Sequence, residues 1–222
     1  MSKIMLNNLS KSYKNKAIFH NVNVMVEPGN MIAIKGKSGV GKSTLLNIIA
    51  GLETATSGSY RLDDMDMEKK NLNQLAKVRG DRIGYISQFS PMIAKLTAYE
   101  NICIPLIFKK KNGKLEVANM KKIVELSKLF QVHHLLNEKI KKLSGGEIQR
   151  VGIIRSIISN PALIVADEPT GSLDDETTSI ILNFFQEAKS NGTTIILATH
   201  SQLVADQSDV VYNLTSGGLH LE

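Results

Sequence analysis

The sequence predicts an α/β fold with a mainly parallel sheet, an antiparallel β lead-in and a helical subdomain. Apolar runs at 163–166 and 193–199 each lead into polar residues, as expected of buried parallel strands. A glycine-rich loop at 36–41 joins an apolar run to a stretch with helical spacing. From 114 to 130, apolar residues recur at helical intervals between lysines and acids, which indicates the helical subdomain.

The first 35 residues have the alternating pattern and the turn residues of short strands, with a Pro28-Gly29 turn before the last of them. The expected strands are 3–9, 22–26 and 31–35. After the glycine-rich loop, leucines and isoleucines at helical spacing predict a helix over 42–50. It is expected to end at Gly51, since glycine is the common residue at a helix end.

Length and composition predict one domain. A chain of 222 residues, 42% of them hydrophobic, is long enough to bury one substantial core. We therefore expect a single domain over 1–222, in which 1–89 and 143–222 form the core. The helical subdomain is expected over 90–142, and a further helix follows at 143.

Charge and cysteine content narrow the class of partner and the compartment. The 27 Lys and Arg exceed the 21 Asp and Glu, and the resulting charge of +6 suits nucleic acid, anionic lipid or a phosphorylated ligand. Cys103 is the only cysteine, so no intrachain disulfide can form and the chain suits a reducing cytoplasm. No secretory signal is expected, and no apolar stretch approaches the roughly 18 residues of a membrane-spanning helix. Any membrane function is thus expected to depend on a partner. Leu221-Glu222 carries no functional prediction, since it can be native or a remnant of cloning.

The loop between the third strand and the first helix fits the phosphate-loop pattern, in which glycines precede Lys and Ser at a fixed spacing. Its residues are Gly36, Lys37, Ser38, Gly39, Val40, Gly41, Lys42 and Ser43, followed by Thr44. The glycines let backbone N–H groups point toward phosphate oxygens, and the helix amino terminus adds positive potential. Lys42 is expected to reach the β- and γ-phosphates of a nucleotide, and Ser43 to ligate magnesium.

Two adjacent carboxylates, Asp167 and Glu168, follow the apolar strand at 163–166. Such a pair can hold magnesium and polarise a water molecule in one place. Asp167 is the expected metal ligand. Glu168 is the expected general base, because a hydrolytic base stands where the attacking water sits. Two acids at a strand end are more often a solvated turn, but a phosphate loop in the same chain reverses that expectation.

A second anion-binding feature is predicted where Leu143, Ser144, Gly145, Gly146 and Glu147 open a helix. Ser and Glu three residues apart form a capping box. Capping leaves the two glycines unexplained, since glycine in a helix costs up to about 1 kcal/mol relative to alanine. They are explained if another group must approach the backbone closely. An exposed helix amino terminus is itself an anion site, so the chain has two features that suit phosphate.

The phosphate loop, the 143–147 segment and the Asp167-Glu168 pair occur in the order found in ABC ATPases, and the chain resembles that family over essentially its whole length. The resemblance implies a P-loop NTPase ABC ATPase core, with ATP and Mg²⁺ as ligands. In that family two copies face head to tail. Each ATP lies between the phosphate loop of one copy and the Leu-Ser-Gly-Gly segment of the other. The two phosphate-binding features then serve different ATP molecules, and an ATP-dependent homodimer is expected.

The resemblance also implies roles for residues that carry little signal alone. Tyr13 resembles the aromatic residue that stacks on adenine. Gln88 resembles the glutamine that contacts magnesium and water, and His200 the histidine that contacts the γ-phosphate. The loop that crosses the dimer seam corresponds to Ser172, Leu173 and Asp174. Without the resemblance, Tyr13 would be a half-buried strand tyrosine and Gln88 an ordinary surface residue.

The segments 166–174 and 96–101 resemble the family branch that serves lipoprotein release and the export of macrolides and antimicrobial peptides. The resemblance implies an integral membrane permease on a separate chain and a place at the cytoplasmic face of the cell membrane. The alternative is an ABC ATPase that acts on nucleic acid or ribosomes, which the basic charge would suit. Such proteins usually contain a long coiled coil or two ATPase cassettes, and neither is present, so no nucleic-acid partner is expected. A purely regulatory nucleotide binder is disfavoured by Glu168 and His200. Nothing in the sequence names the transported substrate.

Overall fold

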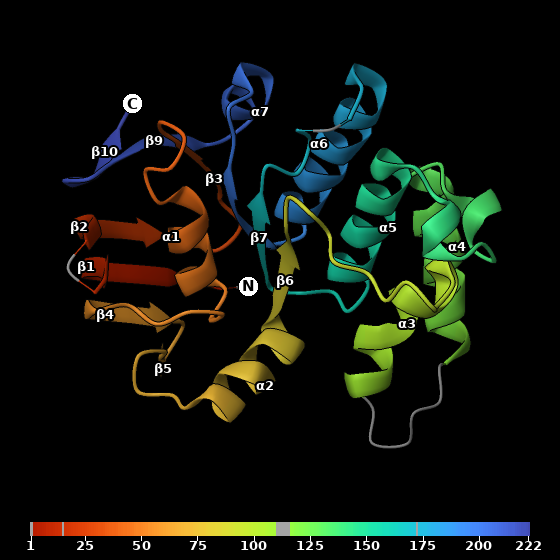
Figure 1. The fold of residues 1–222 in the computed structure, drawn as a ribbon, viewed down its shortest axis with the longest axis horizontal. Helices are drawn as coiled ribbons and strands as arrows, with labels where there is room; N and C mark the ends of the chain where they lie inside the picture. Colours follow the sequence, from red (N-terminus) through yellow and green to blue (C-terminus); the bar gives the residue numbers. More distant parts are fainter. Residues whose placement is uncertain (1, 15, 110–115, 172) are drawn as a thin grey trace.

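The computed structural model describes residues 2–14, 16–109, 116–171 and 173–222. Two sheets and the helices around them form the fold (Figure 1). In this view α1 and the antiparallel strands lie on one side of the parallel strands, and α5 and α6 lie on the other (Figure 1). The α/β fold expected from the sequence is confirmed, including the antiparallel lead-in.

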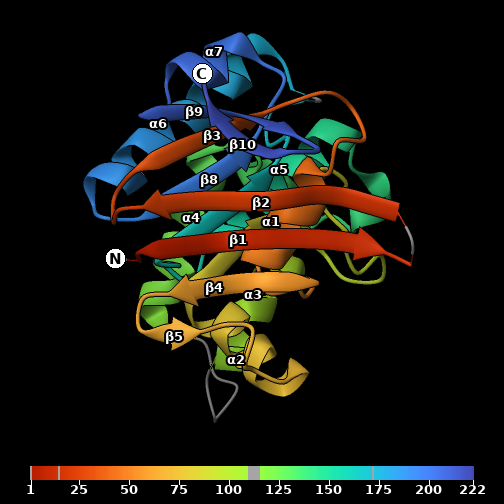
Figure 2. The same cartoon turned by 90° about the vertical axis from the view of Figure 1, so that its left-hand side faces the viewer.

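A four-stranded antiparallel sheet, in the order β2-β1-β4-β5, covers the face seen in Figure 2. Its strands are β1 (Ile4–Tyr13), β2 (Lys16–Val26), β4 (Ser57–Leu62) and β5 (Met65–Asp66). The strand expected at 22–26 is part of the longer β2, and the one expected at 3–9 corresponds to β1, which begins at Ile4 and continues to Tyr13. They extend further because polar residues occupy the exposed side of an antiparallel sheet, so the apolar pattern understates the length of its strands.

The six-stranded sheet carries the functional edge and has the order β10-β9-β3-β8-β7-β6. All neighbouring pairs are parallel except β9 and β10. Its strands are β3 (Met31–Lys35), β6 (Ile83–Ile86), β7 (Leu163–Asp167), β8 (Thr194–Ala198), β9 (Val210–Thr215) and β10 (Gly218–Leu221). Every residue of β7 and β8 is buried, which explains why they appear in the sequence as continuous apolar runs.

Seven α-helices are present in the described ranges, together with short 3₁₀ turns at His133–Leu135 and Ile140–Lys142. The helices are α1 (Lys42–Ile49), α2 (Leu72–Arg82), α3 (Ala98–Lys109), α4 (Val117–Leu129), α5 (Gly145–Ile157), α6 (Asp175–Ser190) and α7 (Gln202–Asp206). The expected helix over 42–50 is α1, and Gly51 follows its end with a left-handed φ of 68°. The expected helical stretch from 114 is α4. Residues 114 and 115 lie outside the described residues.

Two hydrophobic clusters fill the interior. One packs α1 and the antiparallel strands against the parallel sheet. The other joins the sheet to α5 and α6 and also includes Ile102 of α3 and Ile123 of α4. The helical region therefore shares a continuous core with the sheet, and its expected limits at 90 and 142 stay a prediction. Within the described ranges, no helix is both long and apolar enough to cross a membrane.

Candidate functional site

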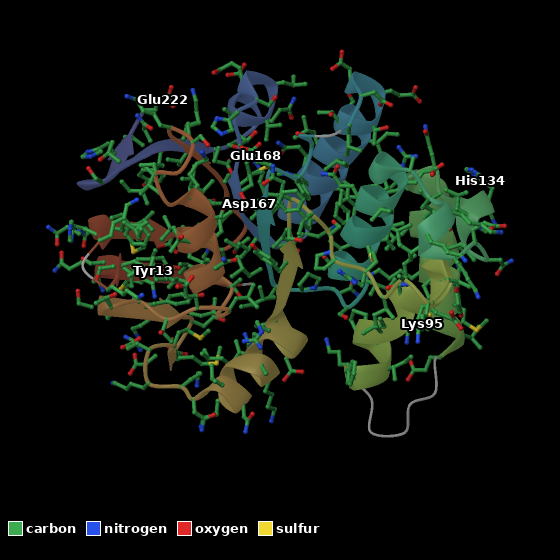
Figure 3. All side chains as sticks on the ribbon, in the orientation of Figure 1. Tyr13, Lys95, His134, Asp167, Glu168 and Glu222 are labelled. Carbon is green, nitrogen blue, oxygen red and sulfur yellow. The ribbon has the colours of Figure 1, made fainter. Side chains whose placement is uncertain are left out.

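Four strands of the parallel sheet deliver polar residues to one edge. The phosphate loop follows β3, and Gln88 lies just beyond β6. Asp167 is the last residue of β7, Glu168 follows it, and His200 follows β8. They border a cavity of about 500 Å³. Of the predicted site residues, the cavity is lined by Ser38, Gly39, Gly41, Lys42, Ser43, Thr44, Gln88, Asp167, Glu168 and His200. Figure 3 places Asp167 and Glu168 together near the middle of the molecule, with Tyr13 apart from them over the antiparallel strands.

The shape of the phosphate loop depends on two of its glycines. Gly36 has φ 146°, and a Cβ there would lie 2.7 Å from the carbonyl oxygen of Leu214. Gly41 has φ 111°, and a Cβ would lie 2.5 Å from Cγ2 of Ile18. Both the left-handed conformation and the close approach exclude larger residues. The glycines that the sequence pattern requires are thus explained by packing within this chain.

The Lys42 side chain is only 8% exposed and points into the loop. Its ammonium group donates to the carbonyl oxygens of Gly36 at 2.8 Å and Lys37 at 3.3 Å. It also lies 3.1 Å from Nε2 of His200, which is 3.4 Å from Oε1 of Glu168. Nε2 can accept a hydrogen bond from the ammonium or donate one toward the carboxylate, but a single tautomer does only one of these. The His200 ring therefore lies between the Lys42 ammonium and the Glu168 carboxylate, in contact with both.

Glu168 has an unusual backbone for a residue with a side chain. Its φ is 49°, and Pro169 follows it, although residues before proline favour extended conformations. Its N–H donates to the Ala198 carbonyl oxygen at 3.1 Å, and its Oε2 accepts from the His200 N–H at 3.3 Å. Its Oε1 is buried and accepts no hydrogen bond. Left-handed residues of this kind cluster at functional sites, and Oε1, which lies 3.4 Å from Nε2 of His200, keeps a hydrogen-bonding capacity that this chain does not use.

The oxygen-bearing side chains at the cavity fit a magnesium ion. Ser43, Gln88 and Asp167 line it together, and hydroxyl, amide and carboxylate oxygens are the ligands that magnesium takes from proteins. Asp167 is 7% exposed, so its carboxylate is held inside the edge of the sheet. In the part of the chain that the structure describes, no three His, Cys, Asp or Glu side chains are grouped so that they could hold a metal ion by themselves.

Tyr13 does not line the cavity but lies beside the loop at the end of β1. Its side chain is 45% exposed, and its hydroxyl donates to the Glu53 carboxylate. The Lys11 ammonium lies 4.7 Å from the centroid of the ring and 2.9 Å from Oε1 of Glu53. The hydrogen bond to Glu53 is the main reason that the pKa of the Tyr13 hydroxyl is raised, with a smaller opposing effect from Thr44. The ring is thus held in place while much of it stays open to solvent.

The segment at 143–147 begins α5, and the expected capping box is confirmed. The Ser144 hydroxyl accepts from the Glu147 N–H at 3.4 Å, and the Glu147 carboxylate accepts from the Ser144 N–H at 2.7 Å. This N–H is the main reason that the pKa of Glu147 is lowered. A Cβ on Gly145 would meet nothing within 4 Å. Neither these residues nor Leu143 and Gly146 line the cavity of their own chain.

The loop between β7 and α6 is described in part. Ser172, one of the residues expected at the dimer seam, lies outside the described residues. Leu173 packs against the hydrophobic core. Asp174 caps α6, where its carboxylate accepts from the Thr177 N–H at 2.7 Å, and this bond lowers its pKa. The intrachain contacts of Leu173 and Asp174 were not anticipated from the sequence.

Three residues at or near the site were missed by the sequence analysis. Ile18 and Gly171 line the cavity. Gln149 of α5 is 4% exposed, and its amide donates to the Pro169 carbonyl oxygen at 2.9 Å. The sequence could have indicated Gln149, because it is a polar residue on the buried side of a helix. Ile18 gives none, since its contact with the loop depends on how β2 packs.

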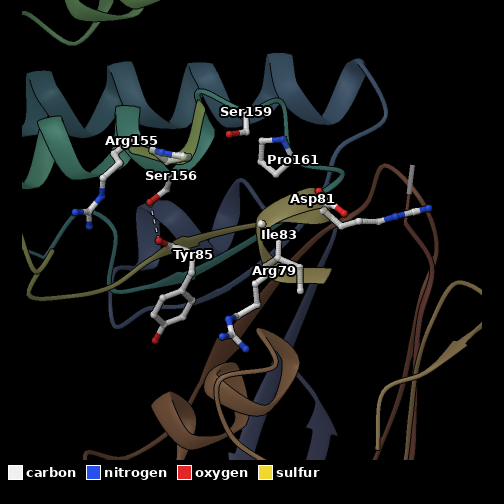
Figure 4. Close-up of a pocket in the computed structure, with 11 residues that line it drawn as sticks. Arg79, Asp81, Ile83, Tyr85, Arg155, Ser156, Ser159 and Pro161 are labelled. Atoms are coloured by element: carbon white, nitrogen blue, oxygen red, sulfur yellow. Dashed lines mark hydrogen bonds between the residues drawn. The ribbon is translucent and has the colours of Figure 1, made fainter. Parts of the chain in front are cut away.

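Two further cavities lie away from these residues. One, of about 250 Å³, is shown in Figure 4 between α2, β6 and α5, and three arginines line it. They are Arg79, Arg82 and Arg155. The other, of about 690 Å³, lies between α4, α6 and the end of α5. No residue that the sequence predicts for the site lines either cavity.

Comparison with known proteins gives a consistent result. A family model described as ABC transporter matches residues 19–171. The chain is 38% identical to the macrolide export ATP-binding/permease protein MacB of Campylobacter jejuni over 96% of its own length, but it spans only 33% of that protein. It is 36% identical to the lipoprotein-releasing system ATP-binding protein LolD of Francisella tularensis, covering 96% of this chain and 94% of that one. The structure is similar, with a TM-score of 0.93, to a dimeric post-hydrolysis state of the ATP-binding cassette MJ0796 bound to ADP and Pi. That alignment has 34% identity and covers 99% of this chain and 97% of the cassette.

Proposed function

The chain belongs to the ABC transporter family as an ATP-hydrolysing cassette, and from this membership we propose that two copies close around two ATP-Mg to drive a separate membrane permease. The observation that carries the proposal is the meeting of Lys42, Asp167, Glu168 and His200 at one edge of the sheet. These side chains come from three strand ends and supply the cation, the metal ligand and the base that phosphoryl transfer to water requires.

Each residue has a role in the proposed reaction. Lys42 leaves the loop carbonyls to neutralise the β- and γ-phosphates, and the backbone N–H groups of the loop hold the remaining phosphate oxygens. Ser43, Gln88 and Asp167 would hold magnesium, which would supply positive charge to offset the charge that develops on the phosphates. Glu168 accepts a proton from the attacking water, and His200 donates a hydrogen bond to the γ-phosphate.

Closure of two copies gives the second phosphate-binding feature its use. The amino terminus of α5 carries the Ser144 hydroxyl, and Gly145 faces open space in its own chain. In the proposed head-to-tail dimer, the amino terminus of α5 binds the γ-phosphate of the ATP that is held by the partner's phosphate loop. In the same proposed dimer, the Leu173–Asp174 segment lies at the seam. The dimeric structures of the MJ0796 cassette support the proposed pairing of two copies.

The proposed permease is an integral membrane protein on another chain, so the cassette works at the cytoplasmic face of the membrane. Support comes from the relatives, which are named for macrolide export with a permease and for lipoprotein release. The proposed cargo is accordingly a peptide, drug or lipid-linked molecule moved by export or extraction. The helical region around 90–142 is the proposed helical subdomain.

The test of hydrolysis is Glu168→Gln, which keeps the shape of the side chain and removes the base. We expect kcat to fall about 100- to 10,000-fold with ATP binding retained, because general base catalysis contributes about that much. With ATP, the variant should elute as a dimer in size-exclusion chromatography. Unchanged turnover would remove Glu168 from the role of base.

The composite site has its own test. Ser144→Arg should still bind nucleotide as a monomer but should not close into a dimer. Lys42→Ala lacks the phosphate contact instead. A mixture of the two variants retains one intact composite site per heterodimer, so some ATP-bound pairing should return. Complete failure to pair would count against sites shared between chains.

The alternative function is an ABC ATPase that acts on nucleic acid or ribosomes, for which the charge of +6 is the one favourable observation. It predicts that ATPase activity rises with added duplex DNA or ribosomes. The transport proposal predicts instead that activity responds to the permease.

A further inference from the structure

Gln149 is a buried polar residue that the mechanism above does not use. It lies in the second turn of α5 and is 4% exposed. Its side-chain amide donates to the carbonyl oxygens of Pro169 at 2.9 Å and Glu168 at 3.5 Å. Both partners are acceptors, so the residue at this position must be a donor to satisfy them.

The carbonyl groups that Gln149 holds belong to the strained turn that carries the Glu168 carboxylate. Glu168 has a left-handed φ of 49° and precedes a proline, a combination that the local sequence disfavours. Such a conformation persists only when surrounding contacts fix it. Two backbone hydrogen bonds fix this conformation. The Gly171 N–H donates to the Glu168 carbonyl oxygen at 3.2 Å, and the Glu168 N–H donates to the Ala198 carbonyl oxygen at 3.1 Å. Gln149 adds a contact from a different helix.

We propose that Gln149 is a positioning residue for the Glu168 carboxylate, an inference that rests on Glu168 being the base. Its amide holds the 168–169 carbonyl groups and so directs the carboxylate to the attacking water. Ser144, at the start of the same helix, faces the ATP held by the partner in the proposed dimer. One rigid helix therefore links the arrival of the partner's nucleotide to the geometry of the base for the chain's own nucleotide.

Other contacts keep α5 fixed against this edge of the sheet. A Cβ on Gly152 would lie 2.5 Å from the hydroxyl oxygen of Ser90, so the segment after Gln88 sits directly on the helix. The Arg155 guanidinium donates to the Pro91 carbonyl oxygen at 2.8 Å. A shift of α5 would therefore displace both the turn that carries Glu168 and the segment that carries Gln88.

The test is Gln149→Met, which keeps the length and flexibility of the side chain and removes the donor. We expect kcat to fall at least about tenfold while KM for ATP stays within about twofold, as for an interaction made only in the transition state. The variant should also accumulate the ATP-bound dimer, as Glu168→Gln should. General damage to α5 would remove that dimer, so its gain separates positioning from a structural role.

Ser127→Ala is the matched control, since it removes a buried hydroxyl that donates to the Val124 carbonyl oxygen within α4. It should lower the melting temperature and leave kcat unchanged. Gln149→Asn shortens the side chain by one CH₂ and should give a kcat between those of the wild type and Gln149→Met. If Gln149→Met does not fold, the kcat of Gln149→Asn tests the role of the amide instead. A kcat within twofold of the wild type, or loss of the ATP-bound dimer, would overturn the role of Gln149. Absence of wild-type hydrolysis, or of a dimer in Glu168→Gln, would overturn the proposed function itself.

Discussion

Removal of the Tyr13 ring tests whether it stacks on the base of the nucleotide. Stacking of a base on an aromatic side chain contributes about 1–3 kcal/mol. With about 1.4 kcal/mol for each tenfold change, Tyr13→Ala could raise KM for ATP by about 5- to 150-fold. The ring is 45% exposed and Lys11 lies over it at 4.7 Å, so part of its surface is already occupied. We therefore expect the lower part of that range, about 5- to 30-fold, with kcat unchanged.

A conservative variant separates the ring from its hydroxyl. Tyr13→Phe keeps the stacking surface and removes the hydrogen bond to Glu53, which holds the ring in place. Because this hydrogen bond is exposed, we take the lower half of the usual range of about 0.5–1.5 kcal/mol, and about 0.5–1 kcal/mol corresponds to a rise in KM of about 2- to 5-fold.

The assay is the initial rate of phosphate release as a function of ATP concentration, with equilibrium nucleotide binding measured in parallel. Phe108→Ala is the control, since that side chain is 87% exposed on α3 and lies away from the cavity. If KM of Tyr13→Ala stays within twofold of the wild type, or if kcat falls instead, Tyr13 does not contact the base.

Three further predictions concern other parts of the molecule. Gly58 has φ 90°, and a Cβ would lie 2.4 Å from the Asn8 carbonyl oxygen, so Gly58→Ala should lower the free energy of unfolding in urea by about 2–5 kcal/mol. A loss below about 0.5 kcal/mol would contradict that packing. Burial raises the pKa of Asp209, but the Lys189 ammonium and a backbone N–H outweigh it, so the pKa lies below its usual value. A lowered pKa gives stability that is present above the unfolded value of about 3.9 and is lost as pH falls through the folded value. Asp209→Asn should therefore be less stable than the wild type at neutral pH and should lose less stability on acidification. If the urea unfolding midpoints of the two proteins change by the same amount as the pH falls, this reasoning is wrong. Gly145→Ala should raise stability by up to about 1 kcal/mol, because a Cβ there meets nothing within 4 Å, yet lower the yield of ATP-bound dimer at least about tenfold. An unchanged yield would show that no partner approaches Gly145 closely.

The parts of the site that could be predicted from the sequence are those built by short segments. The phosphate loop needs its glycines and Lys42 within a few residues of each other. Asp167 and Glu168 follow an apolar strand that is recognisable because every one of its residues is buried. Parallel strands bring their carboxyl ends to one edge, so local patterns were sufficient to predict that these groups meet.

The parts that could not be predicted depend on contacts between distant segments. Gly41 must be glycine partly because Ile18 of β2 lies against it. Gln149 contacts the turn after β7 only because α5 packs against the sheet, in the hydrophobic cluster that also includes Ile164 of β7. The full lengths of β1 and β2 were hidden for a related reason, since the exposed face of a sheet carries polar residues that resemble a loop.

The exposed start of α5 also bears on when the enzyme is active. In the proposed dimer, the loop and α5 of one chain serve different nucleotides, so turnover requires a second copy and the rate per molecule should rise with concentration. Two copies bound to one membrane assembly would experience an effective concentration of roughly millimolar, far above that of a dilute protein. The permease would then activate hydrolysis simply by holding the copies together, and unassembled chains would consume little ATP.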